Sequence, residues 1–108
     1  MKELYEAVEK EVAMELERAA VAHGPTLNSP HEASAVIREE LEEGVGSMVS
    51  TAGSFGLFWN AVKNDDTKSQ RVHLKAMRQV ATLAACEFIQ VAAMAEKALC
   101  CYGEEEEE

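Results

Sequence analysis

A single acidic residue lies in the most apolar stretch of the chain. The segment Val80–Ala95 reads VATLAACEFIQVAAMA, and Glu87 is its only charge. A helix that is apolar on every side is normally buried. An isolated ionised carboxylate in a dry interior is so unfavourable that it neutralises or acquires a partner. The possible partners are an arginine, a proton or a metal ion. Gln90 follows three residues later, on the same helical face.

A second polar pair with the same spacing occurs earlier, in the segment Arg38–Glu43 (REELEE). Glu40 falls inside the apolar stripe of a predicted helix, and Glu43 is its neighbour three residues on. Glu39 and Glu42 point further toward solvent. The stripe consists of Ala33, Val36, Ile37, Leu41 and Gly44.

If the two faces meet, carboxylate and amide oxygens converge from Glu40, Glu43, Glu87 and Gln90. Mg²⁺ prefers oxygen ligands of this kind and keeps some of its waters. Carboxylates packed together without a cation would repel one another and raise their pKa values. The pattern therefore favours a magnesium site. Two alternatives remain open: Glu87 pairs with an arginine, or the two glutamates of the first pair reach water at the edge of their stripe. The candidate arginines are Arg38, Arg71 and Arg78.

Three long helices are predicted to position these residues, and no stretch shows the period-2 alternation of a strand. The first helix runs from about Lys2 to His23, with apolar residues recurring at three- and four-residue steps. Gly24 and Pro25 end it. The second begins at Ser29-Pro30-His31-Glu32, where a serine N-cap precedes proline and a glutamate stands three residues after the cap. His31 is expected to cap or pack rather than to act as a ligand.

The second helix is predicted to continue to about Lys63 through a glycine-containing segment, GVGSMVSTAGSFG. Each glycine costs a helix roughly 1 kcal/mol relative to alanine, yet the apolar residues keep helical spacing. The small residues Gly46, Ser50 and Gly53 would let another helix approach closely; a mobile loop over a ligand and a linker are the alternatives. A turn follows at Asn64–Asp66.

The third helix is predicted from the segment Thr67–Gln70, which resembles another capping box, to about Cys100. Three helices of this length carry more apolar surface than a single chain can bury. We therefore expect an all-α fold in which a second copy of the chain completes an oligomeric helical bundle. One domain is expected over residues 1–103.

The composition limits which partners the protein can bind and indicates the compartment in which we expect it. The formal net charge of −10 argues against binding to nucleic acid or anionic lipid. The five glutamates Glu104–Glu108 should form a disordered acidic tail, either solubilising or interacting. No membrane span or secretory signal is evident, so a cytoplasmic protein is expected. The three cysteines, in a pattern without metal spacing, are interpreted as reduced thiols.

The acidic segments resemble the MazG-like, all-α nucleoside triphosphate pyrophosphatases. Glu39–Glu43 fits the EExxE motif of that family, and Glu87-Phe88-Ile89-Gln90 falls where the family has ExxD. Small phage and prophage members pair segments similar to NSPHEASAVIREELEE and EFIQVAAMA, joined through a helix ending like FWNAVKNDD. The likeness covers Ser29 to Lys97.

The resemblance implies an enzyme that hydrolyses a nucleoside triphosphate to the monophosphate and pyrophosphate, using Mg²⁺, as a dimer or tetramer. By motif position Glu40, Glu43 and Glu87 would be metal ligands, with Gln90 in place of the family aspartate. Glu39 would orient the attacking water. Gln90 removes one negative charge, and the gap between the half-motifs is longer than in better known members. A helical oligomer that has lost turnover and serves as a binding or assembly module is therefore the alternative.

A triphosphate substrate also requires cationic groups. Lys68, Arg71, Lys75 and Arg78 supply a basic group at the start of the third helix, and the last three share a face. The alternative is an ordinary solvated or intersubunit face. Trp59 is a candidate for stacking on the base, although a tryptophan in an apolar stripe is more often part of a core. The base and sugar preference do not follow from the sequence.

Overall fold

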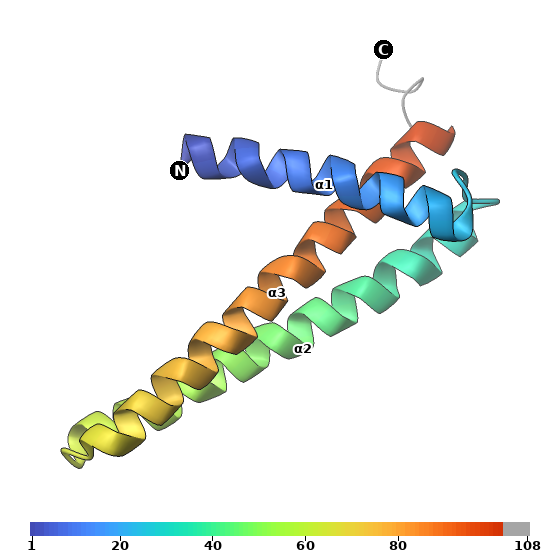
Figure 1. The fold of residues 1–108 in the computed structure, drawn as a ribbon. Helices are drawn as coiled ribbons and strands as arrows, with labels where there is room; N and C mark the ends of the chain where they lie inside the picture. The colour runs from blue at the N-terminus through green and yellow to red at the C-terminus, as the bar shows by residue number, and fades with distance from the viewer. Residues whose placement is uncertain (103–108) are drawn as a thin grey trace. The chain divides into compact units, whose positions relative to one another are not determined.

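The computed structural model describes residues 1–102, and these form three α-helices and no strand. Helix α1 spans Lys2–His23, α2 spans Pro30–Lys63 and α3 spans Thr67–Tyr102 (Figure 1). The prediction of an all-α chain with three long helices is confirmed, including the continuity of α2 through its glycines. The acidic tail predicted at Glu104–Glu108 lies outside the described residues.

The helix ends follow from local chemistry. Gly24 has φ +89°, a conformation that glycine adopts without strain, and its N–H donates to the carbonyl of Ala20 at 2.9 Å. Ser29 caps α2, because its Oγ accepts a hydrogen bond from the N–H of Glu32 at 3.1 Å. The Glu32 carboxylate in turn accepts from the N–H of Asn28 at 2.6 Å.

The N-cap of α3 differs from the predicted one. Asp66 is the cap: its Oδ1 accepts from the N–H of Ser69 at 3.0 Å, and its Oδ2 accepts from the Ser69 hydroxyl at 2.7 Å. These hydrogen bonds to Ser69 hold the pKa of the Asp66 carboxyl below its usual value. The turn before it contains Asp65 at φ +53°, a left-handed position that aspartate tolerates.

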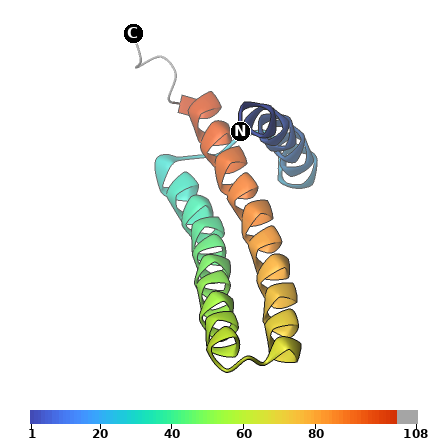
Figure 2. The same cartoon turned by 90° about the vertical axis from the view of Figure 1, so that its left-hand side faces the viewer.

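The described chain divides into two compact units, each containing part of α2 and part of α3. The first unit comprises residues 1–41 together with the residues from Glu87 onward. In it, α1 crosses the C-terminal part of α3, and the start of α2 lies beside that same part (Figures 1 and 2). Cys101 Sγ accepts a hydrogen bond from the N–H of Leu27 at 3.3 Å, which ties the α1–α2 loop to α3.

The second unit comprises Glu42–Cys86 and is an antiparallel helical hairpin (Figure 2). A Cβ built on Gly46, Gly53 or Gly56 meets nothing within 4 Å. The close helix approach predicted from these small residues therefore does not occur at the three glycines among the described residues. None of the three cysteines forms a disulfide within the described residues.

The core of the described chain is small. Its buried apolar side chains are Ala33, Ala61, Ala93, Met94 and Ala98. By contrast, one face of α2 is uncovered in the second unit. Met48, Phe55 and Trp59 follow helical spacing and are 52%, 55% and 50% exposed. Across residues 1–102, no helix combines the length and the apolar character that a membrane span requires.

Candidate functional site

A cleft of about 700 Å³ opens in the first unit. Its walls are the C-terminal half of α1, the loop that follows it, the start of α2 and the C-terminal part of α3. The volume falls within the range of small-molecule sites. The loop at residues 24–29, which forms part of the cleft wall, is held at both ends by the glycine end of α1 and by the Ser29 cap of α2.

Three of the predicted site residues line this cleft: Glu39, Glu40 and Gln90. Glu39 is exposed, whereas Glu40 and Gln90 are half-buried, and Oε2 of Glu40 is buried. The structure thus brings together acidic and amide groups from the two separate segments that were singled out in the sequence. Their oxygens are of the type that binds a hard cation.

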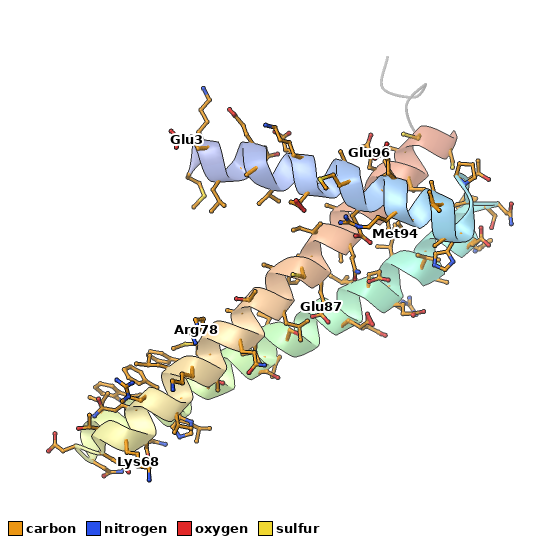
Figure 3. The ribbon with its side chains drawn as sticks, viewed as in Figure 1. Glu3, Lys68, Arg78, Glu87, Met94 and Glu96 are labelled. Atoms are coloured by element: carbon orange, nitrogen blue, oxygen red, sulfur yellow. The ribbon has the colours of Figure 1, made fainter. Side chains whose placement is uncertain are left out.

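Glu87 also belongs to the first unit and is half-buried on α3 (Figure 3). It lies one turn before Gln90 on the same helix. Glu43 follows Glu40 on α2, in the second unit, and is exposed. Within residues 1–102, no group of three or more His, Cys, Asp or Glu side chains is arranged to hold a metal ion.

The predicted substrate-binding residues all belong to the second unit. Lys68, Arg71, Lys75 and Arg78 are exposed on the first half of α3; Figure 3 labels the two at the ends of this series. Trp59 is half-exposed, and the Nζ atom of Lys63 lies 5.9 Å from the centroid of its ring.

Three basic side chains of the cleft were not predicted: Arg18, His23 and Lys97. Arg18 Nε donates to Oε1 of Glu15 at 3.0 Å, and the Arg18 side chain is 58% exposed. Lys97 is only 5% exposed. The signal for Lys97 was present in the sequence, because it continues the face of Gln90 at a spacing of seven residues. The cleft therefore combines acidic and basic groups.

No protein-family model, curated protein or solved structure matches the chain. The function must therefore be inferred from the residues and from their placement in each unit.

Proposed function

We propose that the protein is a Mg²⁺-dependent nucleoside triphosphate pyrophosphohydrolase of the MazG-like kind, acting as a homo-oligomer in the cytoplasm. The observation that carries the proposal is that Glu39 and Glu40, from one motif, line the same cleft as Gln90, from the other. The two motifs are far apart in the sequence. A cleft of about 700 Å³ also leaves room for a ligand of nucleotide size.

In this proposal Glu40, Glu87 and Gln90, which all belong to the first unit, hold Mg²⁺ together with phosphate oxygens of the substrate. Glu43, in the second unit, stays a ligand predicted from its motif alone. Mg²⁺ is usually bound through one or two carboxylates plus substrate phosphates, not by a cage made of protein alone. When bound, the ion would neutralise phosphate charge and lower the pKa of a coordinated water.

The reaction requires a base and a well-placed water. Glu39 is exposed in the cleft, so its carboxylate is available to orient a water molecule and accept its proton. The water oxygen then forms a bond to the α-phosphorus, and the bond from that phosphorus to the bridging oxygen breaks. Pyrophosphate leaves with the electron pair of the broken bond. Lys68, Arg71, Lys75 and Arg78, predicted to stabilise phosphate charge, and Trp59, predicted to stack on the base, belong to the second unit and do not line this cleft.

The test is pyrophosphate release from a panel of ribo- and deoxynucleoside triphosphates with Mg²⁺. We expect release by the wild type that EDTA abolishes, and a loss of about 10²-fold or more for Glu39→Gln. Glu87→Gln should be similarly inactive. Glu42→Gln is the matched control, because Glu42 is exposed and does not line the cleft. Equal activity of Glu87→Gln and the control would contradict the metal-ligand assignment.

A second candidate function is a non-catalytic helical oligomer that acts as a binding or assembly module. The uncovered apolar face of α2 at Met48, Phe55 and Trp59 favours it, because such a face marks an interaction surface. Sedimentation velocity combined with the release assay separates the two functions. A folded oligomer that releases no pyrophosphate from any triphosphate would support the module.

A further inference from the structure

Lys97 is a buried lysine without a partner in the described chain. It is 5% exposed, and its neighbours Met94 and Ala98 on α3 are also buried. Its Nζ is not among the buried side-chain nitrogen and oxygen atoms of the described residues that lack a hydrogen-bond partner, so the ammonium group reaches the cleft while the methylene chain is covered. Across residues 1–102, the structure contains no hydrogen bond or ion pair of Lys97. The Lys97 ammonium group is therefore available to bind an anionic ligand in the cleft.

Lys97 lines the cleft two helical turns after Gln90 on α3. Gln90, Met94 and Lys97 follow one another at four- and three-residue steps and share one helical face. Two helical turns separate the Gln90 and Lys97 backbones, which corresponds to about 10 Å. The cleft wall formed by α3 therefore presents an amide, then an apolar side chain, then an ammonium group.

A second cation enters the same cleft from α1. Arg18 lines it, and the interaction of its Nε with Glu15 leaves the terminal nitrogens of the guanidinium available. Arg18 and Lys97 come from different helices, so an anion between them would be bound from two sides. The carboxylates of the cleft would repel such an anion unless a cation accompanies it, which again favours a metal–phosphate ligand.

We propose that Lys97, with help from Arg18, binds a phosphate group of a pyrophosphate or polyphosphate ligand in this cleft. Lysine binds phosphate as a point charge, and the covered methylene chain of Lys97 holds that charge at the cleft. The inference rests on the proposed function for the identity of the ligand, but it requires binding alone and no hydrolysis.

The experiment is calorimetric titration of the full chain with inorganic pyrophosphate, with and without Mg²⁺. Lys97→Met keeps an unbranched side chain of similar length and removes the charge. We expect the dissociation constant to rise about 10- to 100-fold, the usual effect of losing a hydrogen bond to a charged group. Lys10→Met is the control: Lys10 is exposed on α1 and does not line the cleft, so binding should be unchanged.

A second readout distinguishes binding from a structural role. Because the Lys97 ammonium group has no hydrogen bond or ion pair within residues 1–102, Lys97→Met should leave the melting temperature of the ligand-free protein unchanged or raise it. A structural lysine would instead give a lower melting temperature with pyrophosphate binding retained, and that result would overturn the proposal. If Lys97→Met loses its helical circular dichroism, Arg18→Met tests the same site, because Arg18 is exposed and its replacement should preserve the fold.

The outcomes also separate this inference from the proposed function. Pyrophosphate binding that depends on Lys97, in a protein that hydrolyses no triphosphate, supports the site and contradicts the enzyme. Triphosphate hydrolysis with an unchanged KM in Lys97→Met supports the enzyme and overturns the site. If the wild type binds no pyrophosphate, with or without Mg²⁺, the proposed Lys97 site is also overturned.

Discussion

Replacement of Gly46 and Gly53 by alanine should stabilise the protein. Both glycines lie in the interior of α2, where glycine costs roughly 1 kcal/mol relative to alanine. A Cβ at either position meets nothing within 4 Å, so no steric penalty offsets the gain in helix propensity. Seven residues, or about 10 Å, separate the two positions. The two effects should therefore add, to a total of about 2 kcal/mol.

Thermal unfolding followed by circular dichroism measures this gain. About 2 kcal/mol corresponds to a rise in melting temperature of about 8–16 °C for a domain of this size. Gly24→Ala is the control with the opposite sign. Gly24 adopts φ +89°, which alanine reaches only at a cost, so the same chemical change should lower the melting temperature.

A lower melting temperature for the Gly46→Ala, Gly53→Ala double variant would refute this reasoning. If the loss also increased with rising protein concentration, the two glycines would have to face another copy of the chain at close range. The small residues would then serve the close helix approach that their spacing predicts, but between chains.

Three further predictions concern the oligomer, the metal and the cap of α3. Phe55→Glu should reduce the molar mass measured by light scattering, because it places a charge on the uncovered face of α2; Val21→Glu, at a 91% exposed position, should not. Mg²⁺ should raise the melting temperature of the wild type more than that of Glu40→Gln, whether or not hydrolysis occurs. Asp66 contributes stability above its ordinary pKa of 3.8, and this is lost as the pH falls through the lower pKa of the folded state. Asp66→Asn should reduce the change of melting temperature with pH in this range. An unchanged dependence on pH would contradict the role of Asp66 as the cap.

Helix positions were predictable because their end signals are local. Gly24 ends α1 and Ser29 caps α2 through contacts within a few residues, so neither depends on tertiary structure. The cap of α3 was assigned one residue too late. Asp66 and Thr67 are both good caps, and only the hydrogen bonds of Ser69 to Asp66 decide between them.

The candidate site could be predicted only in part, because its residues come from different helices. Helical spacing indicates which residues share a face, and Glu40 and Gln90, each singled out in this way, both line the cleft. Spacing does not indicate which side chain is sealed from water by another helix. Lys97 shows this limit, since a lysine near a helix end normally extends to solvent. Its burial arises from the packing of α1 and the α1–α2 loop against α3, which no local pattern encodes.

Because the core is small, we expect the stability of the protein to depend on its concentration. Among the described residues, no large side chain is fully buried, and four of the five buried apolar residues are alanines. Ordering a residue costs about 1–2 kcal/mol of backbone entropy alone, and burial of alanine recovers little of it. Association of two chains through the uncovered face of α2 would supply the missing apolar burial.

The melting temperature should therefore rise over a concentration range of about a hundredfold, because mass action favours the associated state. Phe55→Glu should melt at a lower temperature that does not depend on concentration. If the wild type behaves in the same concentration-independent way, three helices with an alanine-rich core must be stable in a single chain. The oligomer would then be unnecessary for folding, and the uncovered face of α2 would have to serve a different partner.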